Sequence, residues 1–147
     1  MPRTFRISRT RVLPAAPAAL FSTLNDPSRW QKWNPYIAFM EPNATVSFSG
    51  PPSGVGAALE WKGGVSGRVE LTESVPPDRV EFRVETAKRV TTMTLELSAG
   101  EGGGTELTWT VVGEHSVLAD WISRLLGLHR LFHAQIDGGM QRLQALV

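Results

Sequence analysis

The side chains that could carry acid–base or metal chemistry are concentrated near the C-terminus of the sequence. His129, His133 and Asp137 are spaced four residues apart, which on a helix would place them along one side. At this spacing each residue is rotated by about 40° from the one before, so the series drifts from a buried direction toward solvent. The glutamate of a His-Glu-x-x-His zinc motif is absent. We therefore predict no metal site and no cofactor.

His129 considered alone allows two interpretations. It interrupts a helical series of apolar residues between Leu125 and Phe132, so a regular helix directs it to the same side as they are. One interpretation is a core histidine that is hydrogen-bonded or lies at the solvent edge. The other is a contact with the polar group of a ligand, because neutral imidazole offers a donor or an acceptor near neutral pH. We take the second as a prediction to be tested.

Other catalytic chemistries find little support in the sequence. The chain has no cysteine, which excludes disulfides, thiol nucleophiles and thiolate metal sites. It contains no Gly-x-Ser-x-Gly elbow, and its glycine runs fall in turns without the lysine or following helix of a phosphate loop. Arg68 and Tyr36 are the residues that could stabilise an enolate in cyclase-type chemistry, but alternation directs Arg68 to solvent. We assign no catalytic residue.

The composition is that of an ordinary globular protein. With 147 residues, 41% of them hydrophobic and 20% charged, the chain is predicted to form a single domain over residues 1–147. The charges are scattered and the net charge is +1, so no surface for nucleic acid is predicted. We see no signal peptide and no apolar run of the ~20 residues that span a bilayer. These features predict a cytoplasmic protein without membrane insertion.

The elements that must position the candidate residues begin with a strand at 4–12 and two short helices at 17–26 and 27–33. Asp26 is expected to cap the second helix and Pro27 to occupy its first position. From 44 to 113 the pattern predicts six strands. Alternation at 79–86, 89–98 and 105–112 predicts an antiparallel meander with one buried and one wet face. The residues predicted to face the C-terminal helix are Val80, Phe82, Val84, Met93, Leu95, Leu107, Trp109 and Val111.

The C-terminal segment is predicted to be helical. Apolar residues recur every three or four positions from about 117 to 147, and Gly127 divides this pattern into a lead-in and a main helix of about 20 residues. Gly138 and Gly139 lie inside the main helix, where each glycine costs up to about 1 kcal/mol relative to alanine. They indicate either loose helix packing, which we favour, or a close approach of the sheet or a ligand at Gly139.

Two tryptophans lie three residues apart just before a helix-ending Asn-Pro pair. On a helix, Trp30 and Trp33 would be neighbours, so one can pack inward while the other borders a cavity. Each of the other large apolar side chains could be plain core on its own. A sheet wrapped on one helix cannot easily close its concave side with small residues, so we expect large inward side chains to form part of a pocket wall.

The order of these elements, together with several short motifs, resembles the START-like helix-grip superfamily, also called SRPBCC. The motifs are APAALFSTLNDPSRWQKWNP at 16–35, Gly56 with Trp61 and Gly67, GTELTW at 104–109, and the closing MQRLQALV. The resemblance covers essentially the whole chain and is to the bacterial polyketide cyclase/dehydrase and lipid transport group. It implies an α+β helix-grip fold, in which a curved antiparallel sheet of about seven strands wraps a long C-terminal helix. Two short helices follow the first strand, and a hydrophobic cavity separates sheet and helix.

By this resemblance the protein is expected to bind a small hydrophobic, lipid- or polyketide-like molecule in that cavity. One alternative is a polyketide cyclase or dehydrase, which inward acid–base residues near His129 would support. A second alternative is a partner-binding module like the co-chaperone members of the superfamily, which a large exposed apolar patch would favour. The residues predicted to contact the ligand are Trp33, Tyr36, Phe39, Trp61, Phe82, Met93, Trp109, His129, Phe132 and Ile136.

Overall fold

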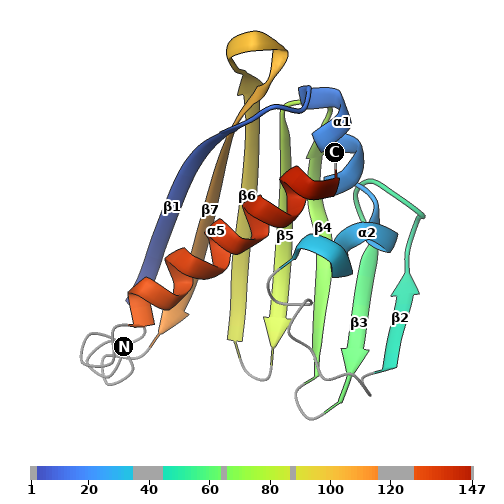
Figure 1. Cartoon of the computed structure of the whole chain (residues 1–147). Helices are drawn as coiled ribbons and strands as arrows, with labels where there is room; N and C mark the ends of the chain where they lie inside the picture. Colours follow the sequence, from blue (N-terminus) through green and yellow to red (C-terminus); the bar gives the residue numbers. More distant parts are fainter. Residues whose placement is uncertain (1–2, 35–44, 64–65, 87–88, 116–127, 147) are drawn as a thin grey trace.

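The computed structural model describes residues 3–34, 45–63, 66–86, 89–115 and 128–146. One antiparallel sheet has its seven strands in the order β1-β7-β6-β5-β4-β3-β2 (Figure 1). The strands are β1 (Arg3–Leu13), β2 (Thr45–Ser49), β3 (Ala58–Lys62), β4 (Gly67–Val75), β5 (Arg79–Thr86), β6 (Arg89–Ala99) and β7 (Thr105–His115). Strands β2 to β7 form the predicted six-strand meander, and β1 pairs with β7 over its whole length.

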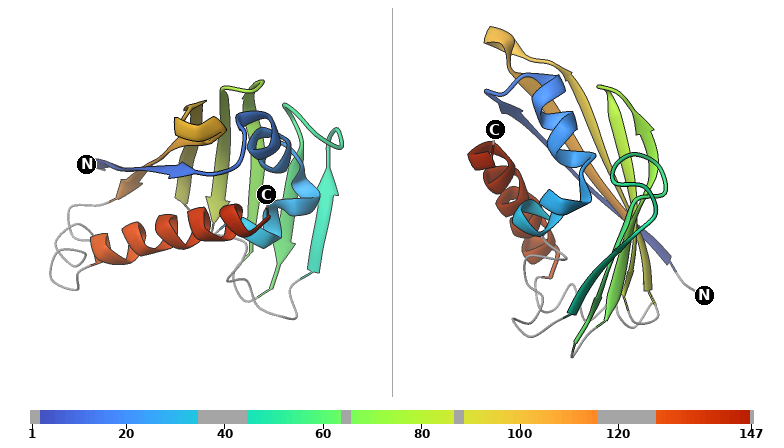
Figure 2. Two further views of the ribbon diagram at one scale, coloured as in Figure 1. Left: turned by 45° about the horizontal axis from the view of Figure 1, so that its top comes forward. Right: turned by 90° about the vertical axis from the view of Figure 1, so that its right-hand side faces the viewer.

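The three α-helices of the described residues lie on the concave side of this curved sheet (Figure 2). They are α1 (Pro17–Leu24), α2 (Pro27–Trp33) and α5 (Leu128–Leu146), and a short 3-10 turn, η1 (Glu101–Gly103), joins β6 to β7. The predicted α+β helix-grip fold, with two short helices after the first strand, is confirmed. None of the described helices is long and apolar enough to cross a membrane.

Alternation along the strands separates a buried face from an exposed one. The eight residues predicted to face inward all have no more than 3% of their surface exposed, and the intervening Glu106 is exposed. On the outer face, Ser8 and Thr110 hydroxyls meet at 3.2 Å and Thr10 and Thr108 hydroxyls at 3.1 Å, bridging β1 and β7. The prediction of one apolar and one polar face is therefore confirmed.

A β-bulge in β4 changes which residues point inward. The register with β5 shifts between Leu71 and Glu73, so the inward position that simple alternation gives to Glu73 is taken by Ser74. The Ser74 hydroxyl donates to the side-chain oxygen of Asn25 at 2.8 Å. Asn25 follows α1, so the bulge supplies a polar tie between the sheet and the turn that joins the two short helices.

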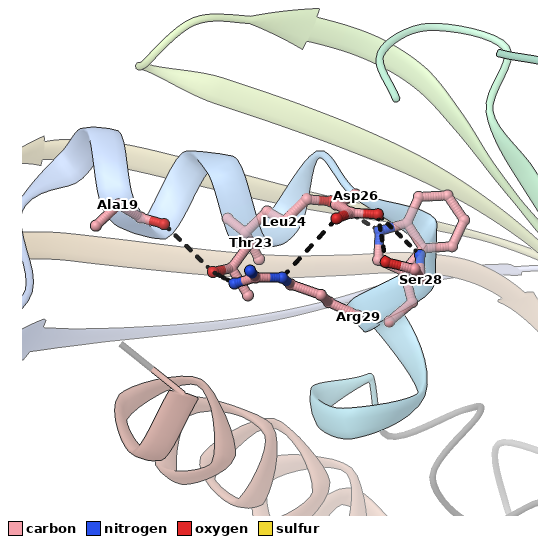
Figure 3. Close-up of polar contacts among 7 residues, drawn as sticks. Ala19, Thr23, Leu24, Asp26, Ser28 and Arg29 are labelled. Carbon is pink, nitrogen blue, oxygen red and sulfur yellow. Dashed lines mark hydrogen bonds and ion pairs between the residues drawn. The ribbon is translucent and has the colours of Figure 1, made fainter. Parts of the chain in front are cut away.

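The turn between α1 and α2 is held by local hydrogen bonds (Figure 3). Asp26 has extended backbone angles and its carboxylate accepts from the Ser28 amide at 3.0 Å, which confirms it as the N-cap of α2. The helix predicted at 17–26 ends at Leu24 instead, because a residue that caps the next helix cannot also continue the previous one. Pro17 and Pro27 occupy first positions in their helices, as predicted.

Helix α5 crosses the concave side of the sheet and contacts β1 and α2. Its 19 residues agree with the predicted main helix of about 20. The Arg9 guanidinium on β1 and the Asp137 carboxylate on α5 form an ion pair at 3.0 Å, and both side chains are half-exposed. The predicted lead-in and its division at Gly127 lie outside the described residues.

Candidate ligand-binding site

Four residues from four elements meet where α5 crosses the sheet, and we call them the tryptophan junction: Trp33 of α2, Phe82 of β5, Trp109 of β7 and Gly139 of α5. The Trp33 and Trp109 rings are 5.6 Å apart at 76°, and the Trp33 and Phe82 rings are 5.7 Å apart at 62°. These edge-to-face arrangements are favourable for aromatic pairs. The three aromatic side chains have no exposed surface, so they pack as core in this conformation.

Gly139 is the point at which α5 approaches the sheet. A β-carbon built there would lie 2.5 Å from Trp109 Cη2 and 2.7 Å from Cζ3, which is too close for any real contact. The helix reaches this position because Gly139 has no side chain. Our preference for loose helix packing at the glycine pair was therefore wrong for Gly139. At Gly138 the nearest atom would be the Arg142 side-chain nitrogen Nη1, at 3.4 Å, which is ordinary contact.

The indole N–H groups distinguish the buried tryptophans from one another. Trp30 packs edge-on against Phe82 at 5.2 Å, and its Nε1 donates to the Leu24 carbonyl oxygen at 2.8 Å. The Nε1 atoms of Trp33 and Trp109 are also buried, each with less than 1 Å² exposed, but they have no hydrogen-bond partner in the described part of the chain. A buried donor without a partner costs about 1–3 kcal/mol. The junction therefore holds two unsatisfied donors.

The other predicted ligand contacts lie around this junction or outside the described residues. Met93 is fully buried on β6, and Ile136, at 3% exposed, faces inward about one turn before Gly139. Trp61 lies across Gly67 on the neighbouring strand, where an added β-carbon would be 2.2 Å from its ring. Tyr36 and Phe39 are outside the described residues, as are the side chains of His129 and Phe132 on α5. Ligand contact by all these residues stays a prediction.

Two polar contacts link α5 to its neighbours near the junction. One is the half-exposed Arg9–Asp137 ion pair, and the other is a hydrogen bond from Arg142 Nε to the Trp33 carbonyl oxygen at 3.4 Å. An exposed ion pair contributes about 0–1 kcal/mol, and 3.4 Å is long for a hydrogen bond. Both contacts are weak, and the buried side chains of Ile136 and Met140 add apolar packing between α5 and its neighbours.

Arg68, one of the two residues considered for cyclase-type chemistry, lies on the outer face of the sheet. It is bonded to Glu60 at 2.6 Å and to Glu70 at 2.5 Å. The hydrogen bond with Glu70, followed by that with Glu60, raises the pKa of Arg68 above its ordinary value. The guanidinium is therefore a permanently charged group on the side of the sheet opposite to α5.

The described residues also line surface hollows away from the junction. One, of about 380 Å³, lies between the start of α2 and the β2–β3 turn, beside the half-exposed Phe48. Another, of about 380 Å³, lies beside the β4–β5 turn and is lined by Arg79 and Glu96 among others. Both are open to solvent at the margin of the sheet, and neither lies between the sheet and α5.

Comparison with known protein families gives one model that matches almost the whole chain. Residues 4–147 match the family described as polyketide cyclase / dehydrase and lipid transport. The chain belongs to this family. Its membership confirms the resemblance that the motifs indicated, and the family's matched range includes every residue of the tryptophan junction.

Solved structures share the fold of this family member at low sequence identity. The protein CV1439 from Chromobacterium violaceum is 20% identical with a TM-score of 0.64, covering 97% of each chain. Ara h 8.0201 is 12% identical with a TM-score of 0.68, covering 98% of this chain and 97% of its own. DynU16, from the dynemicin biosynthetic locus, is 19% identical with a TM-score of 0.57, covering 95% of this chain and 46% of its own. No curated protein matches the sequence.

The sequence pointed to all four junction residues, but we favoured loose packing at Gly139, where the structure shows a close approach to Trp109. Trp33, Phe82 and Trp109 were predicted to contact the ligand, and the structure brings them together. Gly139 was noticed as a costly helical glycine, but nothing local in the sequence says which side chain lies above it. The signal was its place beside the apolar stripe of α5, where a missing side chain permits a close approach.

Proposed function

We propose that this protein binds a small hydrophobic molecule between the concave face of the sheet and α5. Family membership and the helix-grip fold support this proposal. The observation that carries it is the way α5 lies on the sheet: the helix meets Trp109 of β7 through Gly139, and the Arg9–Asp137 ion pair that ties it to β1 is half-exposed. Separating such an interface costs mainly apolar contacts, which an apolar ligand replaces.

Ligand entry requires α5 to move relative to the sheet. The aromatic side chains of the junction have no exposed surface, so a ligand can touch them only after a space opens. Elements that move to admit ligands are those with few stabilising contacts, and an apolar space lined by aromatic side chains is the usual form of a small-molecule site. Helix α5 contributes the buried side chains of Ile136 and Met140 to the apolar layer that a ligand would enter.

A reversible cross-link between β1 and α5 tests this proposal. The chain has no cysteine, so Arg9→Cys with Asp137→Cys introduces the only two thiols. A bismaleimide with a central disulfide then joins β1 to α5, and a reductant releases it. We expect the joined protein to bind 8-anilinonaphthalene-1-sulfonate or a fluorescent fatty acid at least about tenfold more weakly than wild type, and reduction to restore binding.

The matched control places both thiols on one strand. Arg9→Cys with Arg11→Cys carries the same chemistry but joins two residues of β1, so binding should be unchanged by the cross-link. Equal affinity of the β1–α5 protein before and after reduction would contradict the proposal. Because the Arg9–Asp137 pair is half-exposed, its loss alone should not unfold the protein.

Neither alternative function is favoured by a specific observation. Cyclase chemistry would need an electrophilic group beside the ligand, but Arg68 lies on the outer face and is held there by Glu60 and Glu70. A partner-binding module would need a contiguous apolar patch. The large apolar residues exposed in the described part of the chain are instead spread over both edges of the sheet and its turns: Val12, Phe48, Val55, Val75 and Val90.

A further inference from the structure

We propose that the indole N–H groups of Trp33 and Trp109 select a ligand with a neutral carbonyl oxygen, which accepts a hydrogen bond from one or both of them. This inference rests on the proposed function, because it names the chemistry of the molecule that enters between the sheet and α5. It starts from the contrast among the three tryptophans of the described residues that have no exposed surface. Trp30 has a partner for its N–H, whereas Trp33 and Trp109, which touch each other, have none in that part of the chain.

The two unsatisfied donors lie in the layer between sheet and helix. The atoms of Trp109 that face Gly139 are Cη2 and Cζ3, at the end of the indole farthest from its β-carbon. The five-membered ring with Nε1 therefore lies between those atoms and β7. Trp33 ends α2, and its carbonyl oxygen would be 3.4 Å from a β-carbon at Gly139. The Trp33 ring packs against the Trp109 ring at 5.6 Å, so both indoles belong to the layer between α5 and the sheet.

The chain itself offers these donors no acceptor among the buried hydroxyl groups whose bonds are described. Thr23 donates to the Ala19 carbonyl oxygen, and Thr105 donates to the Ala15 carbonyl oxygen. Thr110 meets Ser8 on the outer face. Within the described part of the chain no acceptor reaches either indole N–H. A ligand that supplies one would offset the desolvation cost of each donor that it satisfies.

A carbonyl oxygen fits this arrangement better than a water or a carboxylate. A water brings two donors of its own, and the four junction residues offer no acceptor side chain for them. An ionised carboxylate would have to leave water for a layer in which none of the four junction residues is charged. A ketone or quinone oxygen has two lone pairs and no donor, which matches two N–H groups.

A pair of probes that differ in one group tests the inference. Fluorene and 9-fluorenone share a three-ring skeleton, but only fluorenone has a carbonyl oxygen. We expect wild type to bind fluorenone about tenfold more tightly than fluorene, as measured by calorimetry. In the ¹H–¹⁵N spectrum of the wild-type protein, fluorenone should move the indole protons of Trp33 or Trp109 downfield and leave that of Trp30 in place.

Phenylalanine variants assign the indole signals and supply the control. Trp33→Phe and Trp109→Phe together should bring the fluorenone-to-fluorene affinity ratio close to one, and Trp30→Phe should leave the ratio as in wild type. The ratio cancels any change in packing that affects both probes equally. If the double variant does not fold, the indole shifts in the wild-type spectrum still test whether fluorenone accepts a hydrogen bond from Trp33 or Trp109.

The outcomes separate this inference from the proposed function. Equal affinity for the two probes, with no downfield shift at Trp33 or Trp109, would overturn the carbonyl inference and leave hydrophobic binding in place. Binding of neither probe would overturn both. A downfield shift of Trp30 as large as those of Trp33 and Trp109 would also overturn the inference, because Trp30 already has a partner.

Discussion

Trp30 and Trp33 lie on the same short helix and both pack against Phe82, yet their surroundings differ in one respect. Around Trp30 the polar groups are paired: the indole donates to Leu24, Asp26 caps α2, and Arg29 contacts Asp26 and Thr23 (Figure 3). Around Trp33, the indole donor has no partner among the described residues, and neither has that of its neighbour Trp109. This difference is the basis of our proposal that the second region contacts a ligand.

The largest effect is expected from removing a ring of the junction. Trp109→Ala should lower the free energy of unfolding by about 3–5 kcal/mol, because Trp109 is fully buried and packs against Trp33 and Gly139. Chemical denaturation measures this loss. A loss well below 3 kcal/mol would show that Trp109 borders a hollow space and does not pack as core.

The two adjacent glycines of α5 should respond in opposite directions to the same substitution. Gly139→Ala places a β-carbon into the Trp109 ring and should destabilise the protein by about 1–3 kcal/mol, despite the better helix propensity of alanine. Gly138→Ala meets only the end of the flexible Arg142 side chain and should stabilise it by up to about 1 kcal/mol. Thermal unfolding of the two variants compares them, and equal effects would mean that α5 does not touch Trp109.

The comparison between the two tryptophans of α2 can be measured directly. Trp30→Phe leaves the Leu24 carbonyl oxygen without its indole donor, whereas Trp33→Phe removes a donor that had no partner. Both lose the same volume of side chain. We expect Trp30→Phe to destabilise the protein by about 1–3 kcal/mol more than Trp33→Phe in urea unfolding. The reverse order would show that the Trp33 donor is satisfied in solution.

The smallest expected effect on stability comes from the carboxylate of Glu81, which is unfavourable in its charged form. Burial, and then the adjacent Glu73, raises the pKa of Glu81 above its ordinary value, although Arg79 opposes this. The folded protein therefore holds the Glu81 proton more tightly than the unfolded chain, so stability falls as pH rises from about 4.5 through the raised pKa. Glu81→Gln should remove this fall and stabilise the protein by about 0.5 kcal/mol at pH 7. Its advantage should disappear near pH 4, and a constant advantage at both pH values would contradict this assignment.

The sequence allowed prediction of the elements and of the direction in which most side chains point. Period-two alternation gave the inward positions of Phe82 and Trp109, and the Asp26-Pro27 pair gave the start of α2, because both signals depend on neighbours along the chain. The bulge that turns Ser74 inward could not be predicted, since it arises from pairing with another strand. The hydrogen bond of the Trp30 indole could not be predicted because it depends on how the turn between α1 and α2 folds. The lack of a partner for the Trp33 indole among the described residues could not be predicted because it depends on strands and a helix far along the chain.

The pairing of β1 with β7 has a consequence for how the chain folds. Arg3 pairs with His115 and Leu13 with Thr105, so β1 cannot complete its hydrogen bonds until about a hundred later residues have been synthesised, whereas the hairpins from β2 to β7 form between neighbours. During that interval β1 exposes an unpaired edge, and such edges promote aggregation. Four of its 11 residues are arginines, at positions 3, 6, 9 and 11. Their mutual repulsion keeps nascent copies of β1 from pairing with one another before β7 arrives.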